Sequence, residues 1–225
     1  MKELSCRRAA KALTLVEVLV LIAVVGIFLM LLLPATTSRS RRPYVVRCLN
    51  NLKQIGLALH MFADDNNGRF PSQVSTTNGG SMEFILSNSP ALLFRPLSNY
   101  LSRSWSGWRC PADPSKQSLA TNSVLADRNV SYFISVDATQ ALTNAIHAGD
   151  RNLEVAGQPV APGLFTLTTN TAVGWTREMH KVHLNSLWLG CGNLLFADGY
   201  VRANQVDLPT AIQRQGLATN RLAVP

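Results

Sequence analysis

Residues 18–33 read VLVLIAVVGIFLMLLL, a run of sixteen residues that contains no charge. Extended back to residue 13, the segment has 21 residues, and its polar side chains are Thr14 and Glu17. A helix of this length rises about 31 Å, which matches the hydrocarbon core of a bilayer. A buried core helix is the alternative, but such a helix normally shows a polar face, and this segment is apolar on every side. We therefore expect residues 13–33 to cross a membrane once.

Basic residues flank this segment on both sides and account for much of the net charge of +8. They are Lys2, Arg7, Arg8, Lys11, Arg39, Arg41, Arg42 and Arg47. Basic residues beside a membrane span usually contact anionic lipid, and no basic block with interleaved aromatic residues occurs elsewhere. We therefore expect membrane lipid as a partner and no nucleic acid. The apolar run is longer than the roughly 7–15 residues of a secretory signal, so we expect it to be retained.

Residues 11–17, KALTLVE, together with the apolar run resemble the processing site of type IV pilins and type II secretion pseudopilins. In that family a prepilin peptidase cuts before the apolar helix, and the new first residue is N-methylated. By position, the resemblance implies cleavage between Ala12 and Leu13, N-methylation of Leu13, and a role in assembly for Glu17. Ala12 and Leu13 depart from the glycine and phenylalanine that the family usually has.

Glu17 is also a functional candidate on physical grounds, because a carboxylate inside the edge of an apolar segment is costly. The alternative is a solvated side chain at the level of the lipid headgroups. Cleavage would create an amine at Leu13, and Glu17 of a neighbouring subunit can pair with that cation during assembly. Because an unpaired buried charge is strongly destabilising, such a pair would fix the register between subunits.

The residues after the apolar run predict an amphipathic helix that Gly68 ends. Apolar positions recur at three- and four-residue steps, at Leu49, Leu52, Gly56, Leu59 and Ala63. Residues 48–60 (CLNNLKQIGLALH) and 64–71 (DDNNGRFP) resemble a branch of pilin-like proteins of Planctomycetes and Verrucomicrobia, which end in a His, nine residues, Asp-Gly segment. Residues 64–67 lack the alternating spacing of an EF-hand, so we favour a solvated helix end over a calcium site.

Four cysteines occur, none of them in a CxxC pair, so we expect no zinc site. They are Cys6, Cys48, Cys110 and Cys191. A compartment outside the cytoplasm would permit one disulfide, but the spacing does not give its connectivity. Residues 105–114, WSGWRCPADP, resemble the Cys-Pro-x-Asp element of the same branch, in which Cys48 and Cys110 fall on recurring positions. The resemblance therefore implies a disulfide between Cys48 and Cys110.

The second half of the chain predicts strands and a terminal hairpin. Asp198 and Gly199 stand between apolar runs, which favours a primed hairpin turn, and they match the terminal Asp-Gly element of the branch. Ten residues before Asp198 stands Trp188, where the pattern has His. His180 and His183 lie nearby, and a metal site of His180, His183 and Asp198 is the alternative to the absence of metal that we favour.

Three further features complete the expectations for the head. The amphipathic pattern of residues 91–101 predicts a short helix, although Pro96 interrupts it. The adjacent Asp150 and Arg151 suit a local turn or salt bridge better than catalysis. Asp207 is placed to cap a short helix, with Pro209 in its first turn.

Together these features predict an α+β, pilin-like fold, in which a long N-terminal membrane and stalk helix packs on a small antiparallel β-sheet head. The expected parts are a prepilin leader, a transmembrane helix, a stalk helix and a globular head, over residues 1–12, 13–33, 34–67 and 68–225. The resemblance implies the bacterial inner membrane as the location, with the leader cytoplasmic and the head periplasmic or extracellular; basic residues on both sides of the span do not decide the orientation by charge. No catalytic residue, cofactor or metal is expected.

The expected function is that of a structural subunit of a type II secretion pseudopilus or a type IV pilus-like fibre. Its partners would be a prepilin peptidase, other pilin or pseudopilin subunits, and a secretion or pilus assembly platform. The alternative is a membrane-anchored glycan-binding or hydrolytic protein. The chain has no GxSxG or HExxH motif for hydrolysis, and glycan binding would use the tryptophans, Trp105, Trp108, Trp175 and Trp188.

Overall fold

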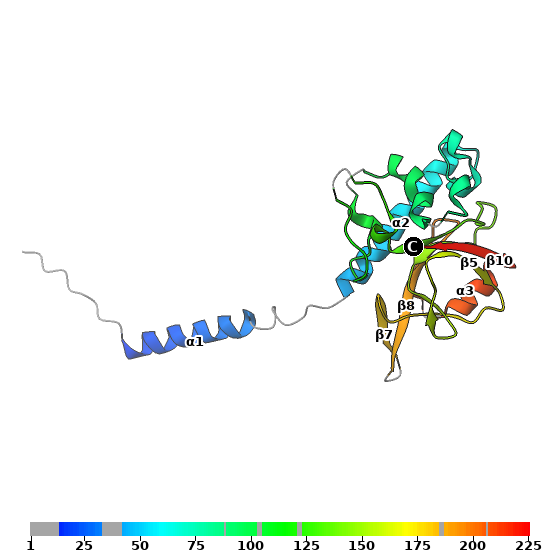
Figure 1. Ribbon diagram of the computed structural model, residues 1–225. Coiled ribbons are helices and arrows are strands. Elements are labelled where there is room, and N and C mark those ends of the chain that lie inside the picture. Colours follow the sequence, from blue (N-terminus) through cyan, green and yellow to red (C-terminus); the bar gives the residue numbers. More distant parts are fainter. Residues whose placement is uncertain are drawn as a thin grey trace, which may run out of the picture. The chain divides into compact units, whose positions relative to one another are not determined.

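Figure 1 shows the computed structural model, which describes residues 14–32, 42–87, 89–102, 105–120, 123–184, 187–205 and 207–225. The chain forms two compact units, Met1–Ser40 and Arg41–Pro225. We call the second unit the head. The expected cleavage site between Ala12 and Leu13 lies outside the described residues.

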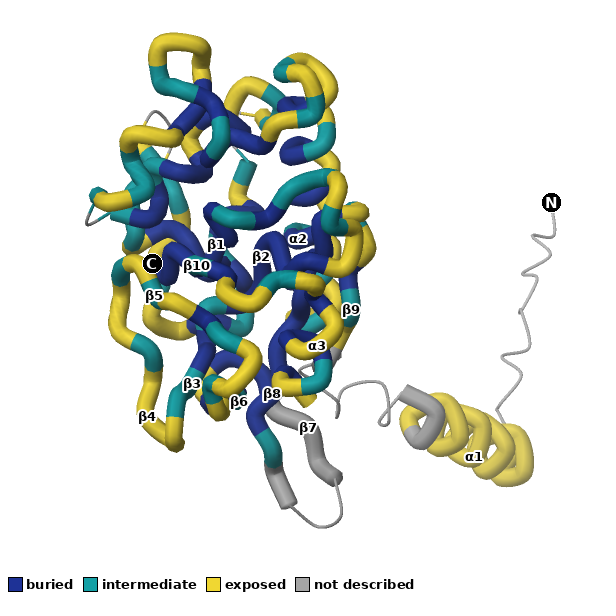
Figure 2. Tube along the Cα trace, turned by 90° about the vertical axis from the view of Figure 1, so that its right-hand side faces the viewer, coloured by how far each residue is buried: buried dark blue, intermediate teal, exposed yellow. Residues whose placement is uncertain are grey.

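The described helix of the first unit is α1, which covers Leu15–Leu32. The backbone N–H and the hydroxyl of Thr14 both donate to Oε2 of Glu17, at 2.8 and 3.0 Å. The Glu17 N–H donates back to the Thr14 hydroxyl at 3.3 Å, which completes a capping box. These hydrogen bonds hold the pKa of Glu17 below its ordinary value. Every side chain over residues 15–29 is exposed, as Figure 2 shows.

The prediction of a transmembrane helix over residues 13–33 is wrong. Among the residues that the structure describes, no helix is both long enough and apolar enough to cross a membrane. The expected single-pass location in the bacterial inner membrane depended on this span and is wrong with it.

The first helix of the head is α2, which covers Arg42–Asp65 and is amphipathic, as its apolar period predicts. Its buried stripe includes Leu52, Ile55 and Leu59, whereas Leu57 on the opposite face is 63% exposed. A helix with one apolar stripe buries that stripe against the core of its own domain. The apolar period of α2 therefore indicates that this helix packs against the core of the head.

Two glycines shape α2. A Cβ at Gly56 would stand 2.7 Å from Cδ1 of Leu195, so this glycine allows the helix to approach the sheet closely. At the end of the helix, the N–H of Gly68 donates to the Ala63 carbonyl oxygen at 2.8 Å. Gly68 has a φ of 75°, which is the left-handed conformation of a glycine C-cap, as expected.

Short 3₁₀ helices occupy much of the chain between α2 and the sheets. They are η2 (Pro71–Gln73), η3 (Thr76–Asn78), η4 (Met82–Phe84), η5 (Pro90–Asn99), η6 (Ser106–Trp108) and η7 (Asp127–Asn129). The predicted amphipathic helix over residues 91–101 is η5, which buries Leu93, Phe94 and Leu97. It is a 3₁₀ helix and contains Pro96, which cannot donate an α-helical hydrogen bond.

Ten strands of the described residues form two antiparallel sheets. Their bounds are β1 Tyr132–Ser135, β2 Ile146–Asp150, β3 Leu153–Val155, β4 Gln158–Pro159, β5 Gly163–Thr168, β6 Val173–Trp175, β7 His180–Leu184, β8 Leu187–Phe196, β9 Val201–Gln205 and β10 Thr219–Val224. The seven-stranded sheet has the order β5-β10-β1-β2-β8-β7, with β9 paired to β8, and the three-stranded sheet has the order β4-β3-β6. The pairing of β1 with β10 brings Ile134 opposite Ala223.

The large sheet is buried on both faces, because successive residues of its central strands enter different cores. Tyr132 and Ile134 of β1 belong to the core that α2 covers, whereas Phe133 belongs to a second core. The second core includes Leu208 and Ile212 of α3 (Leu208–Arg214), which packs against β6. In Figure 2 β1 and β2 are dark blue, in agreement with this double burial.

The predicted fold class is wrong. A long N-terminal membrane and stalk helix on a small sheet is not what the described residues form, since α1 and α2 are separate helices in different units. The head is mainly antiparallel β structure in two sheets, with short helices around them. The stalk predicted over residues 34–67 corresponds to α2, whose apolar face is part of the head's own core.

Candidate functional site

A disulfide joins Cys48 of α2 to Cys110, which follows η6. Their Cα atoms are 4.9 Å apart, and 62 positions separate the two residues in the sequence. This is the pairing that the resemblance implies. The bond ties α2 to the loop of the Cys-Pro-x-Asp element, and both cysteines are fully buried.

Two polar side chains lie beside this bond. The His180 Nε2 atom stands 3.6 Å from Sγ of Cys110 and 3.2 Å from Oδ2 of Asp150. Asp150 is completely buried, and its Oδ2 also accepts from the backbone N–H and the side-chain amide of Asn193, at 2.7 and 2.8 Å. Oδ1 of Asp150 and Nδ1 of His180 are buried and have no hydrogen-bond partner among the described residues. Such atoms are rare in folded proteins and call for a physical account.

Cys191 completes this group, because the register of β7 and β8 places it opposite His180. Burial, together with the nearby charge of Asp150, raises the pKa of its thiol to about 11. At neutral pH Cys191 is therefore protonated and unreactive. We call Cys48, Cys110, Asp150, His180 and Cys191 the disulfide cluster.

An ion pair fixes the loop that carries Cys110. Arg151 donates from Nε and Nη2 to the Asp113 carboxylate, at 2.7 and 2.9 Å, and Asp113 is fully buried. Burial raises the pKa of Asp113, but hydrogen bonds from Arg151 and its charge, with help from Ser115, outweigh burial and leave the pKa below its ordinary value. The salt bridge expected near Asp150 and Arg151 therefore runs from Arg151 to the Cys-Pro-x-Asp element.

A pocket of about 450 Å³ opens beside the disulfide cluster. Its lining includes Tyr44 of α2, Pro111, Glu178, Met179 and His180. His180 is thus shared between the buried cluster and the pocket wall, even though only 2% of its surface is exposed. The pocket provides a route from solvent toward the cluster.

The hairpin of β8 and β9 carries the predicted Asp198 and Gly199 in its turn. The Gly199 N–H donates to the Phe196 carbonyl oxygen at 2.9 Å, and Oδ1 of Asp198 accepts from the Tyr200 N–H at 2.8 Å. Gly199 has a φ of 83°, but Asp198 is not among the residues with positive φ. Both types of primed turn need positive φ at their first central position, here Asp198, so that part of the prediction is wrong.

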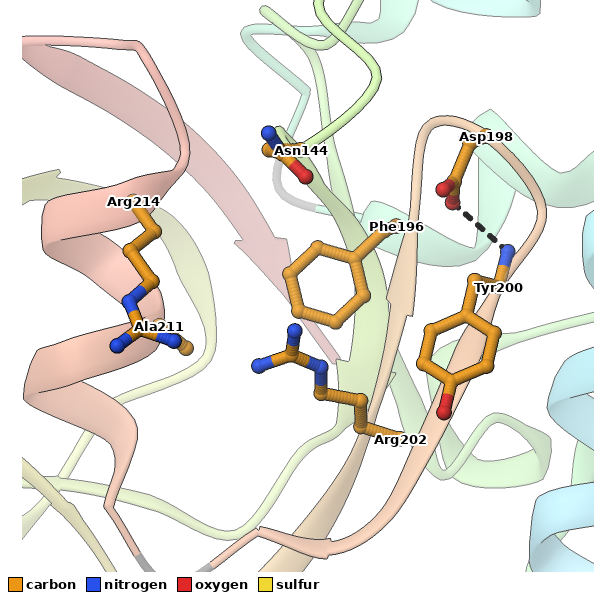
Figure 3. Close-up of a pocket in the computed structure, with 7 residues that line it drawn as sticks. All are labelled: Asn144, Phe196, Asp198, Tyr200, Arg202, Ala211 and Arg214. Atoms are coloured by element: carbon orange, nitrogen blue, oxygen red, sulfur yellow. Dashed lines mark hydrogen bonds between the residues drawn. The ribbon is translucent and has the colours of Figure 1, made fainter.

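A second pocket, of about 280 Å³, lies between this hairpin and α3 (Figure 3). Figure 3 shows the side chains of Arg202 and Arg214 on its two sides, with the Phe196 ring between the strands and the cavity. The guanidinium carbon of Arg202 lies 5.2 Å from the centre of the Phe196 ring. Neither arginine forms a salt bridge within the described part of the chain, so the pocket is basic despite the presence of Asp198.

Two alternatives from the sequence do not find support in the described residues. The proposed ligands His180 and Asp198 are apart, because His180 lies opposite Cys191 and Asp198 follows the other end of β8; the side chain of His183 lies outside the description. The tryptophan side chains that the structure describes do not form an exposed platform either, and that of Trp188 lies outside the described residues. Trp108 and Trp175 are buried, and Trp105 packs edge-on against Trp108 at 4.8 Å.

Sequence reasoning missed the meeting of His180 with Cys110 and Asp150, and it missed the arginine pocket. These residues come from strands and loops that no local pattern connects, so the sequence held no signal for either. No family model matches the chain, and comparisons with curated proteins and with solved structures return no similar protein.

Proposed function

We propose that this protein is a structural, pilin-like subunit, and that copies of it assemble through α1. The observation that carries the proposal is the exposure of α1. Over residues 15–29 every side chain is exposed, and Glu17 is the one charged residue among them. A helix of this kind gains little stability in water by itself, because most helical stability comes from packing.

The absence of a polar face favours other copies of α1 as the partner. A groove on a different protein would cover one side of the helix and leave the rest in water. A bundle of identical helices covers several sides of each member at once, and covers most fully the members at its centre. Burial of a single Leu, Ile or Phe contributes about 1.5–3 kcal/mol, so such a bundle gains enough to exceed the entropy lost on association.

The capping box suggests how Glu17 can serve assembly as well as helix formation. Both hydrogen bonds from Thr14 go to Oε2 of Glu17. Among the described residues none donates to Oε1, and in this proposal Oε1 pairs with a cation from a neighbouring subunit, the amine of a processed Leu13. Processing between Ala12 and Leu13 by a prepilin peptidase, and docking on an assembly platform, remain predictions.

The head supports a structural role. Its buried carboxylates bind structural partners, since Asp113 pairs with Arg151 and Asp150 accepts hydrogen bonds from Asn193. The disulfide connects α2 to the loop that this ion pair holds. These contacts hold the elements of the head together, which suits a subunit whose role in a fibre is structural.

Cysteine cross-linking of the full chain tests the proposal. Gly26→Cys places a thiol on α1, where an added Cβ has no atom within 4 Å, and Leu57→Cys places one on the exposed face of α2. We expect mild oxidation to convert the Gly26→Cys protein to covalent dimers and to form no covalent link through position 57 in the Leu57→Cys protein. Equal cross-linking at both positions, or none at position 26, would overturn the proposal.

A further inference from the structure

We propose that the thiol form of this protein binds a divalent d¹⁰ cation, with Zn²⁺ as the type, through Cys48, Cys110 and His180. The sequence predicts no such site, because the two cysteines are not in a CxxC pair. The fold nevertheless brings one ligand atom from each residue within 4.8 Å of the others, and all three residues are buried. The three come from α2, from the loop after η6 and from β7.

The separation of Cys110 and His180 suits a tetrahedral ion, and the two sulfur atoms, which the disulfide joins in this structure, move apart once they are reduced. With bonds of about 2.3 Å to sulfur and 2.0 Å to nitrogen, two ligand atoms on Zn²⁺ lie about 3.5–3.8 Å apart. The separation of Cys110 Sγ from His180 Nε2 is 3.6 Å. Two thiolates and one imidazole are the ligands that Zn²⁺ prefers among these residue types.

Asp150 supplies the second observation. Its carboxylate is completely buried, lies 3.2 Å from the same Nε2, and leaves Oδ1 without a hydrogen-bond partner in the described part of the chain. A buried negative charge next to three ligand atoms favours a cation at that place. The pocket beside His180 gives the ion and a fourth, water ligand a path from solvent.

The disulfide and the ion are alternatives, because both use the same sulfur atoms. Binding to the thiols forms two metal–sulfur bonds and releases two protons. A small-molecule disulfide can then oxidise the two bound thiolates. Their sulfur–sulfur bond forms, the oxidant takes two electrons and two protons to become two thiols, and the ion leaves. The site is thus present before oxidation and absent after it.

Cobalt titration of the reduced full chain tests this proposal, since Co²⁺ bound by thiolates gives a sulfur-to-metal charge-transfer band. We expect one equivalent of Co²⁺ to produce the band in the reduced protein, Zn²⁺ to displace it, and the disulfide form to show none. His180→Gln should weaken Co²⁺ binding by at least about 100-fold. The matched control, Cys191→Ser, removes a nearby thiol that is not a ligand and should keep the band.

A second measurement uses the unaltered chain, so that it does not depend on whether a variant folds. The reduced protein is alkylated with iodoacetamide in the presence of Zn²⁺ or of Mg²⁺, and mass spectrometry follows each cysteine. We expect Zn²⁺ to protect Cys48 and Cys110, and Mg²⁺ to protect neither. Absence of the charge-transfer band, equal alkylation in both metals, or loss of the band in Cys191→Ser would overturn the proposal.

Discussion

α1 and α2 are both rich in apolar residues, but these residues are arranged differently on the two helices. In α2 the apolar residues recur on one face, and that face packs into the head. In α1 they occupy every face, and all side chains over residues 15–29 are exposed. The difference teaches that apolar periodicity identifies the one face that packs into a domain, whereas a helix that is apolar on every side must be covered around its whole circumference to be buried.

The largest expected effect is loss of the disulfide that fastens α2 to the head. A crosslink that closes a loop of 62 residues stabilises a protein by about 4 kcal/mol in the chain-entropy account. We expect the double variant Cys48→Ser, Cys110→Ser to lower the free energy of unfolding by about this amount in urea titrations. Unfolding that matches the unaltered protein would show that α2 does not depend on this bond.

The two faces of α2 should respond differently to the same truncation. Leu59 is fully buried, so Leu59→Ala should lower the free energy of unfolding by about 2–5 kcal/mol. Leu57 is 63% exposed, so Leu57→Ala should change it by less than about 0.5 kcal/mol. Urea midpoints of the two variants measure the contrast, and equal losses would contradict the assignment of the buried face.

The free energy of unfolding of the head should depend on pH through His147. Burial, and the nearby His60 of α2, lower the pKa of His147 from 6.5 to about 3. The unfolded chain therefore binds a proton that the folded chain does not, and the resulting stability is complete above pH 6.5 and declines as the pH falls toward 3. Between pH 7.5 and pH 5 this amounts to about 2 kcal/mol.

Replacement of His147 isolates that contribution. The free energy of unfolding is measured in urea at pH 7.5 and at pH 5 for both proteins. We expect its decrease between the two pH values to be about 2 kcal/mol smaller in His147→Leu than in the unaltered chain. If the free energy of unfolding depends on pH identically in both proteins, a group other than His147 is responsible for that dependence.

The smallest expected effects concern the start of α1 and separate capping from assembly. A capping box accepts Gln in place of Glu, so Glu17→Gln should keep the helix and remove the charge that pairs with a neighbour. Thr14→Val keeps the charge and removes the cap, which is worth about 1 kcal/mol of helix stability. If the Glu17 charge pairs with a neighbouring subunit, light scattering should show that Glu17→Gln reduces assembly more than Thr14→Val does. If Thr14→Val has the larger effect, Glu17 acts only in capping the helix.

Local patterns in the sequence predicted local structure well. The apolar period of α2, its glycine cap at Gly68 and the cap of α3 by Asp207 all follow from neighbouring residues, and the Asp207 carboxylate does accept from the Thr210 N–H at 3.2 Å. The disulfide pairing came from the resemblance, because spacing alone does not give connectivity. The expected membrane span over residues 13–33 is contradicted, because no helix among the described residues is long and apolar enough to cross a membrane.

Contacts between distant segments escaped prediction for a physical reason. β1 pairs with β10, and Ser135 donates to Asn220 across the sheet, although 85 positions separate these residues. Such pairings depend on the whole fold, and period-two alternation shows only which face of a strand is buried. The meeting of His180 with Cys110 and Asp150 is of the same kind.

The size of the assembly formed by the full chain tests the central claim most directly. Ile22→Lys places a charge on α1, and Leu57→Lys places the same charge at an equally exposed apolar position of the head; the two side chains are 59% and 63% exposed. In analytical ultracentrifugation we expect the unaltered and Leu57→Lys proteins to sediment as large assemblies and Ile22→Lys to sediment as small species. Unchanged sedimentation of Ile22→Lys, or an unaltered chain that stays monomeric, would contradict the account.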